Sequence, residues 1–193
     1  MKKGMAVLFA VILMTSTAAC QKDAGEEIQK RYQEMESYTA VVDLTVTGNK
    51  GAREYQLSQS FRRPEHYRTE ILKPEHLKGT VSVIDEEKVW FRTQGAPAIE
   101  LERSSTELPF DVMSVADFFD AYFALGEPEI ELTEKQAILQ IPFEDGSQEL
   151  QLNLKTWMPE CLRVFDGEEK ERCRLDFVDF VLDAKVADGV FVP

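Results

Sequence analysis

Residues 42–61 read VDLTVTGNKGAREYQLSQSF, and this stretch decides the fold class. Apolar and polar side chains alternate on both sides of the Gly-Asn-Lys-Gly segment at residues 48–51. A period of two is typical of strands with one buried face, and a short glycine-containing segment between two such runs is typical of a hairpin. The stretch therefore predicts two antiparallel strands that share one apolar face.

The same alternation recurs along most of the chain. It predicts further strands at residues 67–72, 81–84, 88–92, 99–102, 129–132, 136–141, 149–154, 160–165 and 172–182. Because short turns join neighbouring strands, we expect an antiparallel sheet and the α+β class. About eleven strands are too many for a flat open sheet, so the sheet should curve into an incomplete β-barrel.

Two segments have a helical period instead. The first, at residues 26–38, places four apolar side chains on one face: Ile28, Tyr32, Met35 and Tyr38. The second begins at Ser114, which forms a capping box with Asp117, and it ends before Gly126. We expect two or more helices of this kind to cover the concave face of the sheet as a lid.

The composition fits a globular domain with few groups for chemistry. The chain has 193 residues, of which 44% are hydrophobic, and this length suits one domain with one core. A net charge of −13 without clustered Lys and Arg argues against a nucleic-acid partner. Two histidines and three cysteines offer little for metal or nucleophile chemistry. We therefore expect no catalytic residue, metal site or cofactor, and no enzyme activity.

Residues 1–19 have the pattern of a secretory signal peptide. Lys2 and Lys3 precede an uncharged run of 16 residues, which is shorter than the roughly 20 that a membrane-spanning helix needs. This segment is therefore excluded from the folded domain, which we place at residues 28–193.

The end of that segment points to lipidation. Thr17-Ala18-Ala19-Cys20 resembles the bacterial lipobox, with Thr17 in the place of the usual leucine. We expect acylation of Cys20, which would anchor the chain to a membrane surface through a polar tether at residues 20–27. The alternative is ordinary cleavage after Ala19, which would leave Cys20 as a free thiol.

The order of several short motifs resembles the LolA/LolB family of lipoprotein carriers. The motifs are Phe61-Arg62-Arg63-Pro64-Glu65-His66-Tyr67-Arg68, Lys73-Pro74, Val83-Ile84-Asp85-Glu86-Glu87-Lys88-Val89-Trp90-Phe91, Leu108-Pro109-Phe110 and the terminal Asp188-Gly189-Val190-Phe191-Val192-Pro193. The resemblance spans about residues 28–193. It implies an incomplete β-barrel with a helical lid and a hydrophobic cavity, which holds acyl chains in the carrier. It also implies that Arg63 contacts the lid.

The apolar faces of the strands and of the second helix are the surfaces that would enclose such a cavity. We expect it to be lined by Val42, Leu44, Val46, Tyr55, Leu57, Phe119, Tyr122, Phe123, Leu150 and Leu152. The alternative is that the aromatic residues of the second helix are simply part of the core.

Cys161 and Cys173 are equally distant in sequence from Gly167. If the last hairpin turns at Gly167, the two cysteines lie directly opposite each other, and a cross-strand disulfide is geometrically allowed. Secretion permits such a bond. The alternative is a pair of buried free thiols.

The function that follows is that of a non-enzymatic, lipid-anchored cell-envelope protein that binds an acyl chain or an apolar partner. Residues 74–79 and the predicted lipidation are most similar to the lipidated Gram-positive members, such as the germination lipoproteins of spore-forming clostridia, which act by binding a cortex amidase. A sporulation or germination lipoprotein that supports a cell-wall enzyme is thus the leading hypothesis. The alternatives are a lipoprotein transport carrier or receptor and an envelope stress sensor.

The expected location follows from the anchor. Acyl chains on Cys20 would hold the protein on the outer face of the cytoplasmic membrane, or on the outer membrane in a Gram-negative cell. The expected partners are that membrane, through the N-terminal acyl chains, and either the acyl chain of another lipoprotein or a cell-wall enzyme.

Overall fold

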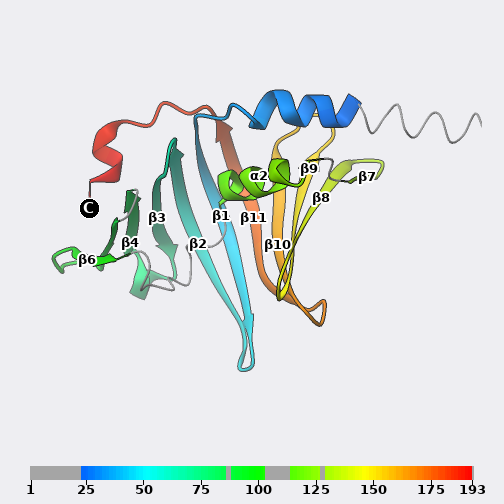
Figure 1. The fold of residues 1–193 in the computed structure, drawn as a ribbon. Coiled ribbons are helices and arrows are strands. Elements are labelled where there is room, and N and C mark those ends of the chain that lie inside the picture. The colour runs from blue at the N-terminus through cyan, green and yellow to red at the C-terminus, as the bar shows by residue number, and fades with distance from the viewer. Residues whose placement is uncertain (1–22, 86–87, 103–113, 127–128, 193) are drawn as a thin grey trace, which may run out of the picture.

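A single antiparallel sheet dominates the computed structural model, which describes residues 23–85, 88–102, 114–126 and 129–192. Its 11 strands run in the order β6-β5-β4-β3-β2-β1-β11-β10-β9-β8-β7, so the sheet begins and ends on separate edge strands and stays open (Figure 1). The strands are β1 (Ser37–Gly48), β2 (Gly51–Arg62), β3 (His66–Lys73), β4 (Val81–Asp85), β5 (Lys88–Arg92), β6 (Ile99–Glu102), β7 (Ile130–Leu132), β8 (Gln136–Phe143), β9 (Gly146–Asn153), β10 (Pro159–Asp166) and β11 (Glu171–Leu182). The predicted α+β class with a curved, incomplete antiparallel barrel is confirmed.

The β1–β2 hairpin has the predicted geometry. Gly48 pairs with Gly51 across a two-residue turn, and Val42 pairs with Leu57 farther along the strands. Gly51 has a φ of 105°, a left-handed conformation that glycine adopts without a steric penalty. Since side chains alternate between the two faces of a sheet, this register puts the apolar residues of both strands on the concave face.

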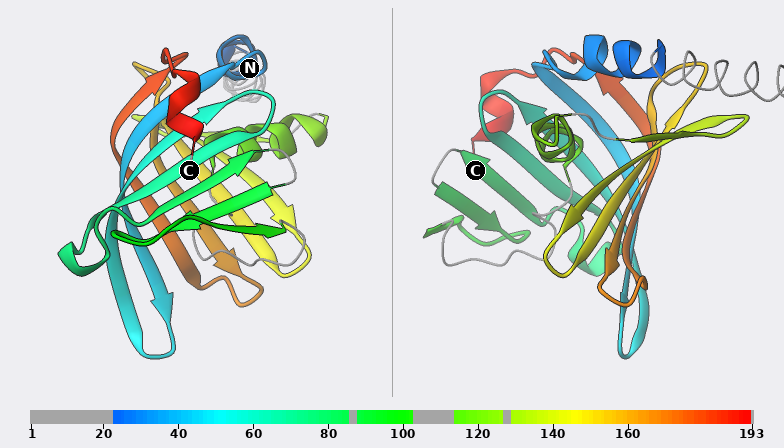
Figure 2. Two further views of the ribbon diagram at one scale, coloured as in Figure 1. Left: turned by 90° about the vertical axis from the view of Figure 1, so that its left-hand side faces the viewer. Right: turned by 45° about the vertical axis from the view of Figure 1, so that its right-hand side comes forward.

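Two helices lie on the concave side of the sheet. Residues 23–32 are helical and run across the ends of the central strands, while α2 (Val115–Ala124) crosses the inner face below them (Figures 1 and 2). Two short 3-10 helices, η1 (Glu75–Leu77) and η3 (Asp188–Phe191), complete the described elements.

The first helix is shifted from its predicted position. Met35 follows the helix and Tyr38 already belongs to β1, yet both side chains remain about 1% exposed. The helix also includes residues 23–27, which we expected as a free tether, and Ala24 is buried in the core. The tether within the described residues is therefore ordered and packed.

The opposite face of the sheet is covered at one end by the C-terminal segment. Phe191 of η3 packs with Val81 and Val83 of β4. Arg62 lies 5.1 Å from the centre of the Phe191 ring and forms an ion pair with Asp188. The terminal motif noted in the sequence therefore serves to cover apolar side chains of β4.

Candidate functional site

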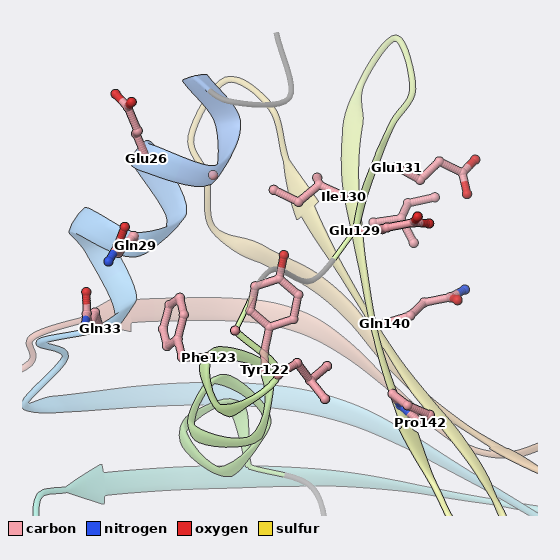
Figure 3. A pocket seen from close by; sticks show the side chains of 14 residues that line it. Glu26, Gln29, Gln33, Tyr122, Phe123, Glu129, Ile130, Glu131, Gln140 and Pro142 are labelled. Atoms are coloured by element: carbon pink, nitrogen blue, oxygen red, sulfur yellow. The ribbon is translucent and has the colours of Figure 1, made fainter. Parts of the chain in front are cut away.

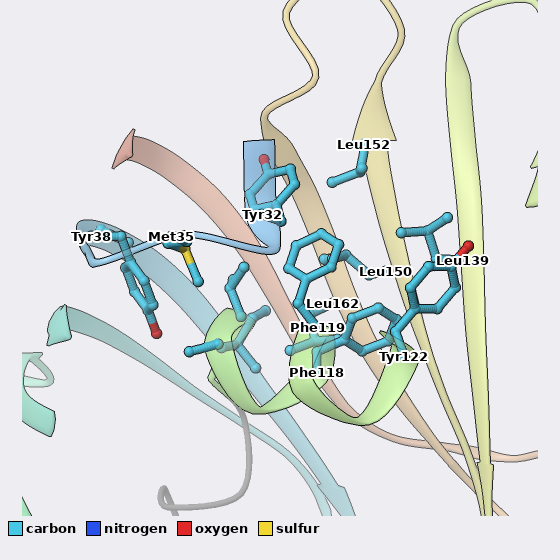
Figure 4. Close-up of a cluster of buried hydrophobic side chains, with 14 of the residues drawn as sticks. Tyr32, Met35, Tyr38, Phe118, Phe119, Tyr122, Leu139, Leu150, Leu152 and Leu162 are labelled. Atoms are coloured by element: carbon cyan, nitrogen blue, oxygen red, sulfur yellow. The ribbon is translucent and has the colours of Figure 1, made fainter. Parts of the chain in front are cut away.

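The α2 helix fills the concave face with aromatic side chains. Ser114 caps it, since its hydroxyl accepts a hydrogen bond from the Asp117 amide at 2.9 Å, as the capping box predicted. Phe118, Phe119 and Tyr122 are at most 3% exposed. Phe119 stacks on Tyr32 of the first helix with ring centres 4.0 Å apart (Figure 4). Both helices and the sheet thus share one core.

Most residues predicted to line a cavity lie in this core. Seven of the ten are buried: Val42, Leu44, Leu57, Phe119, Tyr122, Leu150 and Leu152. The other three, Val46, Tyr55 and Phe123, are partly buried against the same cluster. A side chain that borders a water-sized void keeps some accessible surface, but Phe119, Leu150 and Leu152 are 0% exposed. At these positions the structure shows packed core, and the expected cavity stays a prediction.

An open groove remains beside the core. It has a volume of about 1170 Å³ and runs between the first helix, the end of α2 and strands β7 and β8 (Figure 3). This volume is enough for a small molecule or a short segment of a partner protein. The residues that line it are Gly25, Glu26, Gln29, Gln33, Tyr122, Phe123, Leu125, Gly126, Glu129, Ile130, Glu131, Ile138, Gln140 and Pro142.

The groove combines an acidic rim with an aromatic wall. Glu26, Glu129 and Glu131 contribute carboxylates, and none of the described lining residues is basic. Tyr122 and Phe123 form the aromatic wall. The buried Tyr122 hydroxyl has no hydrogen-bond partner among the described residues, and burial raises the pKa of Tyr122 to about 12.

Sequence reasoning found only two of the residues that line this groove, Tyr122 and Phe123. Glu26 and Gln29 lie on the first helix and Gln33 follows directly after it, and this run of polar residues was the one available signal. The contributions of β7 and β8 depend on strand pairing at the far edge of the sheet, which periodicity does not reveal.

Two contacts, which we call the α2 latch, hold α2 against the strands. The Arg63 guanidinium donates hydrogen bonds to both carboxylate oxygens of Asp120, at 2.7 and 2.8 Å, and to the Met35 carbonyl at 3.2 Å. The Tyr67 hydroxyl donates to Asp117 at 2.7 Å. The hydrogen bond to Asp120 raises the pKa of Arg63, and burial followed by the Asp117 charge raises the pKa of Tyr67.

Solved structures of similar fold agree with the resemblance seen in the sequence. A chain in the structure of the CwlD amidase from Clostridioides difficile in complex with the GerS lipoprotein is 23% identical, with a TM-score of 0.52 over 83% of this chain and 95% of that chain. An uncharacterized conserved protein from Thermus thermophilus is 16% identical, with a TM-score of 0.50 over 84% and 90%. A LolA superfamily protein from Nitrosomonas europaea is 14% identical, with a TM-score of 0.49 over 87% and 97%.

The chain has a LolA-like fold. At these identities the likeness is one of fold, and the resemblance drawn from the motifs is confirmed at that level. No protein-family model and no curated protein gives a significant match to the sequence. In this LolA-like chain Arg63, for which the resemblance implied a lid contact, is bonded to Asp120 of α2.

The two cysteines of the LolA-like domain lie on the predicted pair of strands, but they are not opposite each other. Cys161 pairs with Asp176, Cys173 pairs with Val164, and both thiols are free. The predicted register is therefore wrong by three residues, and an odd offset puts the two side chains on opposite faces. The cause is a loop longer than a turn at Gly167: the Asp166 amide bonds the Lys170 carbonyl at 3.0 Å, so the hairpin is centred beyond Gly167.

Both thiols should be slow to react in the folded protein. Burial raises the pKa of Cys161 to about 12 and that of Cys173 to about 11. At pH 8 almost none of either thiol is then ionised, and the thiolate is the reactive form. A chromogenic disulfide reagent should label both only slowly in a Cys20→Ser variant, and quickly after denaturation. Rapid labelling of the folded protein would contradict the burial of the thiols.

No group of three or more His, Cys, Asp or Glu side chains in the described part of the chain is placed to hold a metal ion. Among the helices described, none has both the length and the apolar character to cross a membrane.

Proposed function

We propose that this chain is a non-enzymatic, lipid-anchored cell-envelope protein that binds a partner and supports a cell-wall enzyme. The observation that carries the proposal is the state of the concave face. Most of the described residues that would enclose an acyl chain are packed as core, while the acidic groove, whose aromatic wall is Tyr122 and Phe123, stays open to a partner. A protein partner can use such an open surface without any change in the core.

The chemistry of the groove supports a binding role. Its described lining offers carboxylates, amides and aromatic rings, but no Ser, Cys, His or Lys side chain that could act as nucleophile or base together with them. An aromatic wall surrounded by a polar rim is typical of surfaces that bind proteins. An acyl chain, in contrast, would leave three carboxylates facing hydrocarbon.

The structural likeness and the signal sequence support the location. One similar chain comes from a complex between an amidase and a lipoprotein, and the lipobox-like residues before Cys20 are typical of an acylated envelope protein. We therefore place the protein on a membrane surface outside the cytoplasm, where it would support a cell-wall amidase in sporulation or germination.

Binding to an amidase is the direct test. The Cys20→Ser protein should bind at least one cell-wall amidase of the same organism with saturable calorimetric titration. The double variant Glu129→Arg/Glu131→Arg, on the groove rim, should weaken this binding by about tenfold or more because rim charges face the partner. The double variant Glu54→Arg/Glu168→Arg makes the same change of charge away from the groove and should bind normally.

A different result would favour a transport role. If no amidase binds, and an acylated peptide instead binds saturably to the Cys20→Ser protein without the rim substitutions, the protein is a lipoprotein carrier or receptor. The proposal that it binds a cell-wall amidase is then wrong.

A further inference from the structure

Two turns and the start of the first helix form one connected end of the domain, which we call the anchor-side end. It consists of residues 23–27, 132–135 and 154–157, and it lies at the same end of the domain as the β7–β8 hairpin (Figures 1 and 2). The Leu154 amide bonds the Lys135 carbonyl at 2.9 Å, which joins the two turns. The Tyr32 hydroxyl donates to the Trp157 carbonyl at 2.6 Å, which joins the second turn to the helix.

Apolar side chains line a shallow cleft on this end. The cleft has a volume of about 600 Å³, and Ala24, Leu132, Leu154 and Trp157 supply its apolar walls. Trp157 is only partly buried against the core, so part of its indole remains accessible. A tryptophan with one buried and one accessible side is the type of residue that is enriched where proteins meet the polar surface of a bilayer.

Two exposed lysines, Lys135 and Lys155, lie on the two turns of the anchor-side end. The end also carries the acids Asp23, Glu26, Glu27 and Glu134, of which Glu27 is paired with Arg31 at 2.5 Å. Since lysines beside an anionic lipid surface are attracted to it, the two turns are the part of this end that contacts the lipid phosphates in the proposal below.

The length of the chain before the helix limits the distance to the membrane. Only Gln21 and Lys22 separate Cys20 from Asp23, which is already in the helix. Three Cα–Cα steps span at most about 11 Å. If Cys20 carries the acyl chains, the first turn of the helix must therefore stay close to the lipid headgroups, and the rest of the anchor-side end is attached to that turn.

We propose that the anchor-side end rests on the lipid surface, with Trp157 at the headgroup level and Lys135 and Lys155 beside the lipid phosphates. This proposal rests on the acylation of Cys20 in the proposed function. It fixes the orientation of the domain: the β6 edge of the sheet then lies on the side away from the anchor, while the open groove, which Gly25 and Glu26 help to line, begins next to the membrane.

The two tryptophans allow a direct test. Trp90 lies on β5, next to the β6 edge, at the opposite end of the sheet from β7. Full-length acylated protein carrying Trp90→Phe reports on Trp157, and protein carrying Trp157→Phe reports on Trp90. In vesicles of phosphatidylcholine and phosphatidylglycerol that contain lipids spin-labelled near the headgroup, Trp157 fluorescence should fall by about half while Trp90 fluorescence stays nearly unchanged. Equal quenching of the two, or quenching of Trp90 alone, would overturn the proposal.

Two control comparisons separate orientation from anchoring. Lys135→Glu/Lys155→Glu should reduce the quenching of Trp157 while the acylated protein stays on the vesicles, and Lys30→Glu/Lys185→Glu, with the same change of charge, should not. A Cys20→Ser protein should neither incorporate a clickable fatty acid in cells nor stay on the vesicles. Fatty-acid labelling of wild type and Cys20→Ser to the same extent would refute the anchor itself, whereas labelled protein without selective quenching of Trp157 would refute only the orientation.

Discussion

Replacing Phe119 with alanine should lower the free energy of unfolding by about 3–5 kcal/mol, the usual range for truncation of a fully buried Phe. Phe119 is 0% exposed, stacks on Tyr32 and contacts Phe118, Tyr122 and Phe123 through their rings. The substitution therefore removes contacts that join α2 to the first helix and leaves a cavity between them. Urea denaturation followed by circular dichroism measures the change.

The matched control is Phe143→Ala at the end of β8. Phe143 is 43% exposed, so its truncation should cost less than about 1 kcal/mol. A similarly small loss for Phe119→Ala would contradict the packed concave face and would favour the acyl-chain cavity expected from the sequence.

The sequence predicted the fold best where a turn is short and marked by glycine. The β1–β2 hairpin has Gly48 and Gly51 on either side of a two-residue turn, so the alternating pattern fixes its register. The β10–β11 hairpin has a longer loop, in which the side chain of Asp166 accepts hydrogen bonds from the Glu168 and Lys170 amides. Gly167 lies off the centre of this loop, and a register centred on it gave the wrong partners for both cysteines.

Helical and strand periods can give the same burial for a single residue. Tyr38 fits the helical face of residues 26–38, but it also has the parity of the inward residues of β1. The sequence therefore predicted the burial of Tyr38 correctly, although it assigned the residue to a helix and the structure places it in β1. The end of the helix could not be placed because both alternatives bury Met35 and Tyr38.

The groove could not be predicted from sequence patterns because its lining residues come from elements that are far apart in the chain. Glu26, Tyr122 and Gln140 come from the first helix, α2 and β8. The latch is an intermediate case: the resemblance named Arg63, whereas its partner Asp120 follows only from the packing of α2 on the sheet.

The Arg63–Asp120 contact is one of the two that form the latch, and Asp120→Arg should break it. The two hydrogen bonds from Arg63 would be replaced by repulsion between two cations. Because the side chains of Arg63 and Asp120 are 29% and 51% exposed, solvent screening limits the expected loss of stability to about 1–2 kcal/mol. Amide hydrogen exchange along α2 should become faster than exchange along β1, and urea denaturation gives the loss of stability.

The charge-swapped protein Arg63→Asp/Asp120→Arg provides the control, since it restores an ion pair at the same place. It should recover most of the lost stability and slow the exchange of α2, although the hydrogen bond to the Met35 carbonyl is not restored.

Titration with a fluorescent fatty acid tests whether breaking the Arg63–Asp120 contact opens a binding site. If α2 is a lid, Asp120→Arg should bind the probe more tightly than the unmodified protein and the swapped protein should not, because release exposes Phe119 and the strands beneath it. If α2 exchanges faster but the affinity for the probe is unchanged, the helix is a fixed part of the core, and the open groove is the surface on which partner binding depends.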